Sequence, residues 1–501
     1  MSLPAWLEPL LDAAQMRAVD AWAIDERGVP SLDLMERAGA GLAAVAAAMA
    51  PQGRIAVVAG KGNNGGDGLV AARRLRADGR EVDVLLVGEP GEFSGDAQAN
   101  LERLSGTAPL SPGSAIAAEA TLVVDCLLGT GATGAPRGAV AEAIASIRAR
   151  GLPVLAADVP SGVDASSGEI AGLSVLADAT ATFHAAKPGL WIEPGRGCAG
   201  RVSVLDIGMP SGAPVAPDAG LIRDEILEEI PRRGVGSTKF TSGRVLVAGG
   251  SPGLTGAPCL AALAAARAGA GYVTACVPES LALVFEARLL ETMTLALPDE
   301  HGAHCAAGVA LLAAAAAARG GALVLGPGLG RSEAAAAFAR ALLDAVELPI
   351  VLDADGLNAY AGALDALRGR AAVLTPHEGE LARLLACDAA TVAGARLRSA
   401  REAAARAGAV VVLKGDDTLV AAPDGVVAVS PGATPALATA GTGDVLGGVL
   451  AAMLAKGLEP FTAACAAVRL HALAGIHATE QHGREGLIAS DVVEALAAVR
   501  R

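Results

Sequence analysis

Short apolar runs that alternate with helix-like segments are the feature that most restricts how this chain can fold. In the first half the runs lie at 54–59, 82–87, 122–126, 153–157, 179–183 and 202–207. Helix-like stretches at 69–78 and 139–150 separate several of them. Continuous apolar strands joined by helices indicate a parallel sheet that is covered by helices on both faces. The pattern therefore predicts an α/β fold.

The second half repeats this pattern without any residue-level repeat of the first. Its strand candidates lie at 244–248, 272–277, 323–326, 350–353, 372–375 and 410–414. A hairpin-like pair follows at 418–422 and 426–430, with the turn sequence PDG between the two strands. Since ligands of open α/β sheets bind beyond the carboxyl ends of the strands, we expect sites at the glycine-rich stretches that follow these runs.

A stretch rich in proline, glycine and alanine at 208–220, GMPSGAPVAPDAG, has no periodicity and is typical of a linker. A single hydrophobic core rarely serves a chain of 501 residues. We therefore predict two domains, at 1–215 and 221–501.

Charge and cysteine usage exclude several classes of protein. With 39 basic and 53 acidic residues the formal net charge is −14, which argues against a nucleic-acid partner. The seven cysteines form no CxxC pair, so neither a disulfide framework nor a zinc site is expected. The first twenty residues lack a signal-peptide pattern, and the longest apolar run, at 306–318, is too short to span a membrane. A cytoplasmic enzyme without a membrane partner is the expectation.

Lysine is rare in this chain, which supplies nearly all its positive charge as arginine. Only five lysines occur, and three of them lie in or beside glycine-rich stretches: Lys61, Lys239 and Lys414. That placement is a weak indication of specific roles.

Three polar clusters follow strands in the first half. They read GKGNNGGDG (60–68), DCLLGTGATGAPRG (125–138) and DVPSGVD (158–164). Asn64, Asp125 and Ser161 from these clusters supply oxygen atoms that suit one hard cation. Each residue alone is more often a helix cap or a turn former, but three at successive strand ends favour a shared site.

These motifs, with the opening segment at 16–39, resemble the NAD(P)H-hydrate epimerase family over about residues 10–210. The resemblance implies a Rossmann-like, three-layer domain and a potassium ion held by Asn64, Asp125 and Ser161. It also implies that the hydrated dinucleotide contacts Asn63, Asn64, Gly65, Gly66, Asp67, Gly129, Thr130, Gly131, Ala132, Thr133, Gly134, Ala135 and Asp158. Some relatives carry a lysine in the loop that here reads GTGATGA.

Epimerisation at the hydrated ring carbon needs a group that transfers a proton. Asp158 is our candidate because it is a carboxylate at a strand end beside the expected ligand. A carboxyl group needs a raised pKa to act as an effective acid–base group near neutral pH.

The strongest motif of the second half is ATAGTGDVLGGVLAAML at 438–454, a glycine-rich turn that leads into an apolar helix. Backbone N–H groups at Gly441, Thr442 and Gly443 suit an anion at a helix N-terminus. Asp444 beside them suits a base that takes a proton from a hydroxyl group during phosphoryl transfer. A lone aspartate there would more often only stabilise the helix start.

With TPHEGE (375–380), LKGDDT (413–418) and LTGAP (254–258), this motif resembles the ADP-dependent NAD(P)H-hydrate dehydratases, a branch of the ribokinase-like kinases, over about residues 225–500. The resemblance implies a ribokinase-like α/β/α domain that uses Mg²⁺ and ADP. Its implied substrate contacts are Ala257, Gly328, His377 and Asp444, and its implied nucleotide contacts are Lys414, Gly415, Asp416, Asp417, Thr418 and Gly443. Leu254 replaces a tyrosine of many relatives, and STKFTSG (237–243) departs from the usual start, so Lys239 stays unassigned.

Together the two resemblances imply a homo-oligomeric enzyme that epimerises R- and S-NAD(P)HX and dehydrates the S form, giving NAD(P)H, AMP and phosphate. Phosphorylation of the ring hydroxyl would turn a poor leaving group into a good one. The GTGD motif also fits an ATP-dependent small-molecule kinase fused to a non-catalytic nucleotide-binding module. Donor choice, and whether a phosphorylated product accumulates, would distinguish the two.

Overall fold

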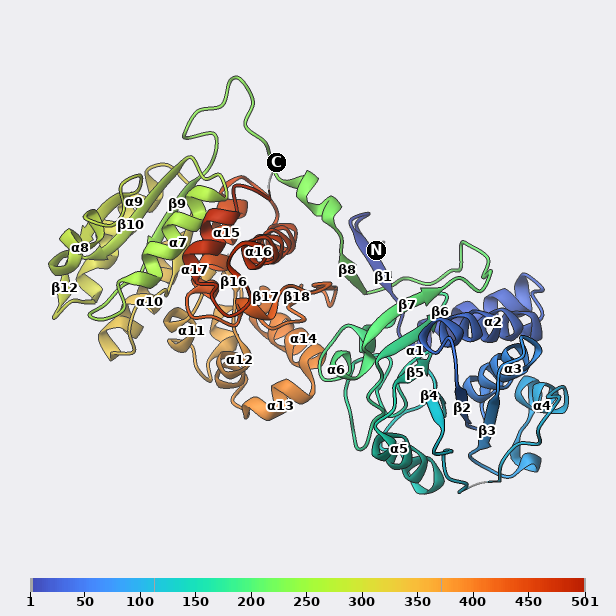
Figure 1. Cartoon of the computed structure of the whole chain (residues 1–501). Helices are drawn as coiled ribbons and strands as arrows, with labels where there is room; N and C mark the ends of the chain where they lie inside the picture. The colour runs from blue at the N-terminus through green and yellow to red at the C-terminus, as the bar shows by residue number, and fades with distance from the viewer. Residues whose placement is uncertain (1–2, 112, 371, 500–501) are drawn as a thin grey trace. The chain divides into compact units, whose positions relative to one another are not determined.

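Two compact units make up the computed structural model, which describes residues 3–111, 113–370 and 372–499. Residues 9–220 belong to the first unit, and residues from Leu221 onward belong to the second (Figure 1). The short segment Pro4–Glu8 belongs to the second unit, although it precedes the first in the sequence.

A six-stranded sheet in the order β3-β2-β4-β5-β6-β7 forms the centre of the N-terminal unit, and all its neighbouring strands are parallel. The strands are β2 (Arg54–Ala59), β3 (Val82–Leu86), β4 (Ala120–Cys126), β5 (Val154–Ala157), β6 (Ala179–Phe183) and β7 (Arg201–Leu205). All six predicted strands and their parallel pairing are confirmed.

Two separate hydrophobic cores place helices on both faces of this sheet. One core joins α2 and α3 to the strands, and the other joins α5 to them through Ile144 and Ile147. The helices are α1 (Ala13–Ala21), α2 (Ser31–Met49), α3 (Asn63–Ala77), α4 (Gly95–Glu102), α5 (Gly138–Arg150) and α6 (Arg196–Ala199). The unit is the predicted three-layer, Rossmann-like fold.

An eleven-stranded sheet in the order β1-β8-β19-β18-β17-β16-β15-β14-β9-β10-β11 belongs to the C-terminal part of the chain. The strands are β1 (Leu7–Leu10), β8 (Ala219–Ile222), β9 (Arg244–Ala248), β10 (Tyr272–Pro278), β11 (Met293–Leu297), β14 (Ala322–Leu325), β15 (Ile350–Leu352), β16 (Ala372–Leu374), β17 (Val410–Leu413), β18 (Leu419–Ala421) and β19 (Val427–Val429). From β11 to β17 neighbouring strands are parallel, and β17, β18 and β19 are antiparallel, so the predicted hairpin is confirmed. A separate pair joins β12 (Asp299–Glu300) to β13 (Ala303–His304).

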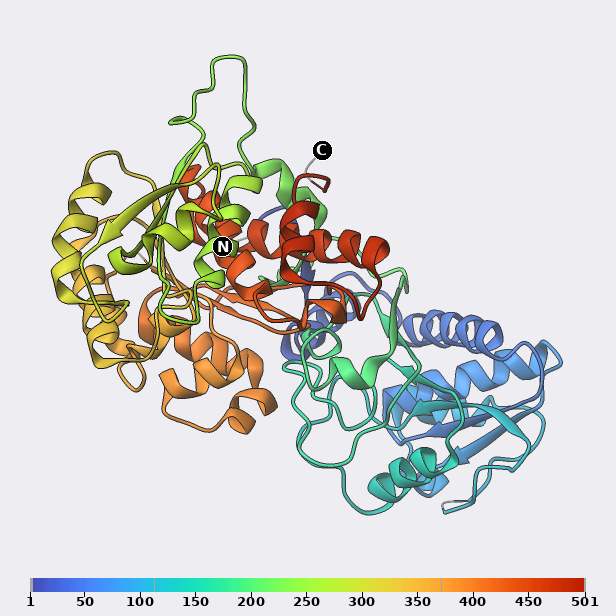
Figure 2. The ribbon, with the colours of Figure 1, turned by 60° about the vertical axis from the view of Figure 1, so that its left-hand side comes forward.

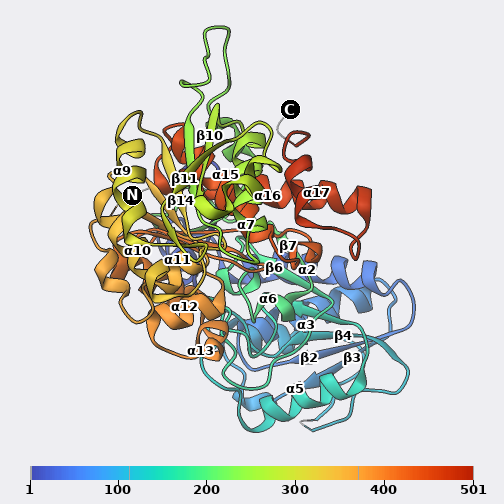
Figure 3. The ribbon, with the colours of Figure 1, turned by 90° about the vertical axis from the view of Figure 1, so that its left-hand side faces the viewer.

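Helices lie on both sides of this sheet, as Figure 3 shows for α7, α15 and α16 on one side and α10, α11 and α12 on the other. The helices are α7 (Gly256–Arg267), α8 (Ala282–Glu286), α9 (Val309–Ala317), α10 (Glu333–Ala345), α11 (Asp355–Asn358), α12 (Glu378–Leu385), α13 (Ala389–Gly394), α14 (Arg396–Ala407), α15 (Thr442–Ala455), α16 (Pro460–His482) and α17 (Ala489–Ala495). Among the described residues only α16 is long and apolar enough to cross a membrane, and 61% of its apolar window is buried. It packs against α15, as a core helix does.

The N-terminal strand β1 was missed in the sequence, because its four residues, LEPL, carry no alternating pattern and include a proline. Trp6 is only 6% exposed, and its ring centroid lies 6.1 Å from that of Phe461 on α16. The backbone N–H of Arg223 donates a hydrogen bond to the Trp6 carbonyl at 3.0 Å. Residues 4–8 therefore depart from the expected first domain, 1–215, because they pack on the second unit. The expected linker also ends in a strand, since β8 begins at Ala219.

Replacing Trp6 with alanine should destabilise the C-terminal unit by about 3 kcal/mol, as expected for removing a large buried aromatic side chain. Glu8→Ala, at an exposed position of β1 two residues after Trp6, is the matched control and should change little. Denaturant unfolding followed by a probe in the C-terminal unit measures both. Equal stability of the two variants would show that the segment is not part of this unit's core.

Candidate active sites

The glycine-rich motif after β2 forms the first turns of α3 and not a loop before it. The helix begins at Asn63 and not near residue 69, where the apolar pattern starts. A Cβ atom added at Gly60 would lie 2.1 Å from the Leu127 carbonyl oxygen, and one added at Gly65 would lie 1.7 Å from the Gly60 carbonyl oxygen. The glycines therefore let the helix start pack directly against two strand ends.

Asn64, Asp125 and Ser161, the three predicted cation ligands, lie together at the ends of β2, β4 and β5. Ser161 donates to Asp125 from its backbone N–H at 2.9 Å and from its Oγ at 2.7 Å, and its Oγ accepts from the backbone N–H of Leu128 at 2.9 Å. Asn64 Nδ2 donates to the Leu128 carbonyl at 2.8 Å.

The side-chain oxygen of Asn64 is buried and has no hydrogen-bond partner among the described residues. An orphaned buried oxygen beside a buried carboxylate fits a cation that prefers oxygen ligands. Burial raises the pKa of Asp125 to about 6 despite the hydrogen bonds from Ser161. The described residues contain no group of three or more His, Cys, Asp or Glu side chains that could hold a metal ion. The amide, carboxylate and hydroxyl oxygens of Asn64, Asp125 and Ser161 differ from the nitrogen and sulfur ligands that are typical of transition metals.

A cavity of about 650 Å³ opens beside this cluster. Eight of the predicted substrate contacts line it: Asn63, Asn64, Asp67, Gly129, Thr130, Gly131, Ala132 and Asp158. Five others do not: Gly65, Gly66, Thr133, Gly134 and Ala135. Gly66 instead faces Met35, whose sulfur would lie 2.6 Å from an added Cβ atom.

Asp158 is held by a buried lysine that the sequence reasoning missed. Lys187 is completely buried and donates from its Nζ to Asp158 Oδ1, to Thr182 Oγ1 and to the Phe183 carbonyl, each at 2.8 Å. Thr130 donates to the other Asp158 oxygen from its backbone N–H, at 3.1 Å, and from its hydroxyl group. The Asp158 backbone has a φ of 65°, a conformation that is uncommon for a residue with a side chain and that recurs at functional sites.

These partners set the charge of Asp158. Burial alone would raise its pKa, but the Lys187 ammonium and the Thr130 bonds outweigh burial and lower it. Asp158 therefore lacks the raised pKa that an acid–base role near neutral pH would need, because a lysine that the sequence pattern did not reveal lies against it. By contrast, burial raises the pKa of Asp67 well above its ordinary value, and Asp158 and Asp20 add to this shift.

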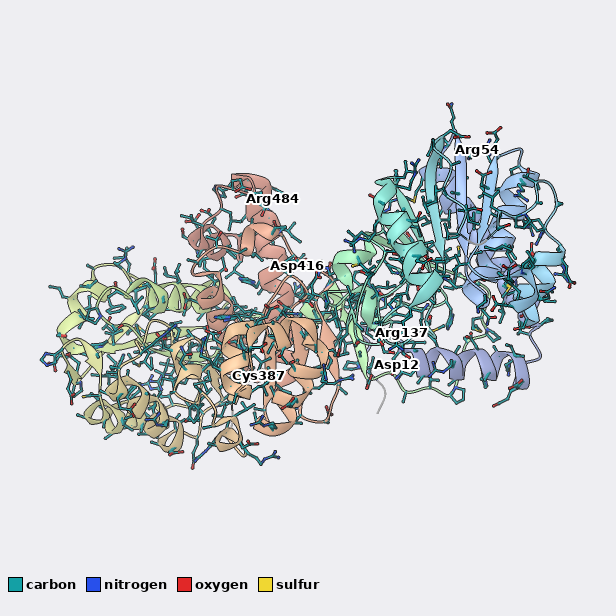
Figure 4. The ribbon with its side chains drawn as sticks, turned by 90° about the horizontal axis from the view of Figure 1, so that it is seen from below. Asp12, Arg54, Arg137, Cys387, Asp416 and Arg484 are labelled. Atoms are coloured by element: carbon teal, nitrogen blue, oxygen red, sulfur yellow. The ribbon has the colours of Figure 1, made fainter. Side chains whose placement is uncertain are left out.

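In the C-terminal unit, α15 begins at Thr442 after Gly441, whose φ is 92°. The start of the helix borders a cavity of about 240 Å³. Five predicted nucleotide contacts line this cavity: Lys414, Gly415, Asp416, Thr418 and Gly443. Asp416, labelled in Figure 4, lies in the turn after β17.

Lys414 connects this cavity to a cluster of carboxylates. Its Nζ lies 2.9 Å from Asp353 Oδ1 and 3.7 Å from Glu380 Oε2. Burial, with Asp353 close by, raises the pKa of Asp444 to about 7, and Lys414 only partly offsets this. Asp353 ends the strand predicted at 350–353, and Glu380 ends the TPHEGE segment at 375–380, but nothing in the sequence distinguished them from their neighbours.

Two predicted contacts have structural partners instead. Asp417 is 1% exposed, and its carboxylate pairs with Arg396 at 2.8 Å, away from the cavity wall. His377 caps α12, because its Nδ1 accepts from the backbone N–H of Gly379 at 3.0 Å, and 55% of its side chain is exposed. Ala257 and Gly328 do lie side by side, since a Cβ atom added at Gly328 would be 3.4 Å from that of Ala257.

The other two lysines that lie beside glycine-rich stretches, Lys61 and Lys239, take no part in the ion pairs of either site. Lys61 lines the rim of the larger cavity and pairs with Glu92 at 3.2 Å, with both side chains about half exposed. Lys239 belongs to the long loop that precedes β9 (Figure 2), and its Nζ lies 5.2 Å from the centre of the Phe240 ring.

Comparison with known proteins matches both units. The family model described as NAD(P)H-hydrate dehydratase matches residues 245–498, and the one described as YjeF-related protein N-terminus matches residues 31–189. The bifunctional NAD(P)H-hydrate repair enzyme of Salinibacter ruber is 40% identical over 97% of this chain and 95% of its own length. The enzyme of the same name from Moorella thermoacetica is 39% identical over 98% of this chain and 96% of its own.

A solved structure is similar to the C-terminal unit. It is the ADP/ATP-dependent NAD(P)H-hydrate dehydratase from Bacillus subtilis, co-crystallised with ATP and Mg²⁺. It is 29% identical, covers 55% of this chain and 95% of its own, and superposes with a TM-score of 0.46.

The close approach at Gly65 gives a stability prediction. Gly65→Ala should destabilise the N-terminal unit by about 3 kcal/mol or more, because the new methyl group would collide with backbone. Gly62→Ala is the matched control. Nothing lies within 4 Å of a Cβ atom there, and its φ of −90° suits alanine, so the cost should stay below about 1 kcal/mol. Thermal unfolding of both variants measures the difference, and equal losses would contradict the packing argument.

Proposed function

The chain belongs to the family of bifunctional NAD(P)H-hydrate repair enzymes, and we propose that its N-terminal unit interconverts the epimers of hydrated NADH and NADPH while its C-terminal unit dehydrates one of them. Family membership rests on relatives that match nearly the whole chain. The single structural observation that carries the proposal is that each unit places its motifs around a cavity. A stereospecific dehydratase clears both epimers only if a second activity exchanges them, so one chain with both sites is a complete repair system.

In the proposed C-terminal reaction, Asp444 accepts the proton of the ring hydroxyl as that oxygen attacks the terminal phosphoryl group of ADP. Phosphate then leaves the ring carbon, the neighbouring carbon loses a proton, and the ring double bond is restored with AMP as the other product. The N–H groups at the start of α15 face the transferring group, since helix N-termini favour anions. Mg²⁺ bound with the nucleotide would neutralise charge on its phosphates, and Mg²⁺ needs only one or two protein carboxylates beside those phosphates.

In the proposed N-terminal reaction, the hydrated ring occupies the cavity beside Asp158, and potassium lies at Asn64, Asp125 and Ser161. The buried, unpartnered oxygen of Asn64 supports a cation there. Family resemblance, and not coordination chemistry, selects potassium. On family membership alone we also propose that the enzyme works in the cytoplasm as a homo-oligomer.

Potassium should stabilise the N-terminal unit. A ligand that binds only the folded state adds about 2.7 kcal/mol at a concentration one hundred times its Kd. We expect the melting temperature of the wild type to rise when K⁺ replaces choline, and Asp125→Asn to remove most of that rise. An equal response in the variant would place the ion elsewhere. Dehydratase activity should be normal in Asp125→Asn, which confirms that the C-terminal unit is intact.

Mixed epimers with ADP give the test of the whole proposal. The wild type should restore the absorbance of the reduced ring until both epimers are consumed. Asp444→Asn should lower the dehydratase rate by about 10²–10⁴-fold, because it removes the base but keeps the shape of the side chain. Epimer exchange in the same variant should continue. A stable phosphorylated product made from ATP would favour the small-molecule kinase instead.

The pH dependence of the dehydratase provides a further check on Asp444. With a pKa of about 7, Asp444 is protonated and inactive as a base below that value. The rate should therefore rise as the pH increases through about 7 and level off above it. Asparagine at 444 should abolish this rise. If asparagine retained most of the turnover, Asp444 would only stabilise the start of the helix.

A further inference from the structure

Asp67 is a buried carboxyl group without a hydrogen-bond partner among the described residues. It lies on α3, one turn beyond the helix start, and its side chain forms part of the wall of the N-terminal cavity. It is 8% exposed. A buried polar group that lacks a partner within the protein is one that a ligand can satisfy.

Asp158 lines the same cavity but has the opposite surroundings. Its two oxygens accept from Lys187, Thr182 and Thr130, and the Lys187 ammonium is itself completely buried. The cavity is therefore lined by the Asp158 carboxylate, which has an ion-pair partner and several hydrogen bonds, and by the Asp67 carboxyl group, which has no hydrogen-bond partner among the described residues.

The charges around the cavity favour different protonation states for Asp67 and Asp158. Burial raises the pKa of Asp67, with further contributions from Asp158 and Asp20, whereas Lys187 holds Asp158 ionised. The remaining charged groups that line the cavity are Arg17, which is exposed, Asp96, and Lys61, which pairs with Glu92. Two carboxyl groups whose surroundings shift their pKa values in opposite directions suit separate acid and base roles.

We propose that Asp67 is the proton donor of the epimerisation and that Asp158 is the base that accepts a proton from the incoming water. Water that has bonded to the cationic ring carbon is strongly acidic, so a carboxylate that stays ionised is basic enough to take its proton. This inference rests on the proposed function of the N-terminal unit. Lys187 is a positioning residue, because it touches Asp158 and keeps that carboxylate ionised and in place.

The chemistry of the substrate class needs such a pair. Hydration of the ring's enamine double bond places the hydroxyl on the carbon next to the ring nitrogen. Asp67 gives its proton to this hydroxyl, the C–O bond breaks, and water leaves while the nitrogen lone pair forms a C=N double bond. Water then adds to the opposite face of the same carbon, its electron pair returns the double-bond electrons to nitrogen, and its proton passes to Asp158. Proton exchange with solvent resets both carboxyl groups, so no oxidant or co-reactant is consumed.

The test starts from one purified epimer without any nucleotide, so that the dehydratase is silent, and follows its exchange by chromatography. We expect Asp67→Asn to lower kcat for exchange by about 10²–10⁴-fold with KM changed by less than about threefold. Asp78→Asn, at the exposed C-terminal end of the same helix, is the matched control and should exchange at the wild-type rate. An unchanged melting temperature of the N-terminal unit shows that each variant is folded, and dehydration of the S epimer with ADP shows that the C-terminal unit is intact.

Several results would overturn the proposal. Wild-type-like kcat in Asp67→Asn, or a rise in KM at unchanged kcat, would leave Asp67 a contact residue only. No exchange by the wild type above the spontaneous rate would reject the epimerase function itself. A readout that needs no variant is the wild-type pH profile, in which kcat/KM should fall at alkaline pH as Asp67 loses its proton. A rate that stays level or increases there would exclude Asp67 as the acid.

Discussion

A lysine paired with one aspartate lies at the centre of each of the two sites. Lys187 holds Asp158 at 2.8 Å in the N-terminal unit, and Lys414 holds Asp353 at 2.9 Å in the C-terminal unit. In each case the paired carboxylate raises the pKa of a second carboxyl group close by, Asp67 or Asp444. The two units thus share an electrostatic arrangement in which one ammonium group lies close to two carboxyl groups.

The fold was largely predictable because strands that are buried on both faces must be apolar throughout. The strand at 54–59 was predicted with the bounds the structure shows, and so was the one at 179–183. The start of α3 was not, because Asn63–Gly68 holds glycine and polar residues that fit a loop equally well. Only the approach of Gly65 to the Gly60 carbonyl explains why a helix begins there.

The position of a candidate site residue was predictable where it follows from the residue's own strand end, and unpredictable where it depends on distant parts of the chain. Asn64, Asp125 and Ser161 follow successive strands, so their meeting was a matter of sheet geometry. Lys187 lies after β6 in a stretch that resembles no binding motif, and only the folded chain shows that its ammonium group ends beneath Asp158. The motifs that contain Asp417 and His377 lie in the region of the candidate site. The Asp417 carboxylate, however, pairs with the buried Arg396, and the His377 side chain caps α12.

The position of Trp6 determines how late during synthesis the C-terminal unit can complete its folding. The segment that closes one edge of the C-terminal unit leaves the ribosome well before its partner Phe461, which follows it by most of the length of both units. The first unit can fold as soon as its own strands are available, since domains generally fold in sequence during synthesis. The second cannot complete its packing until the whole chain is free, so the newly made protein carries an unburied tryptophan throughout its synthesis.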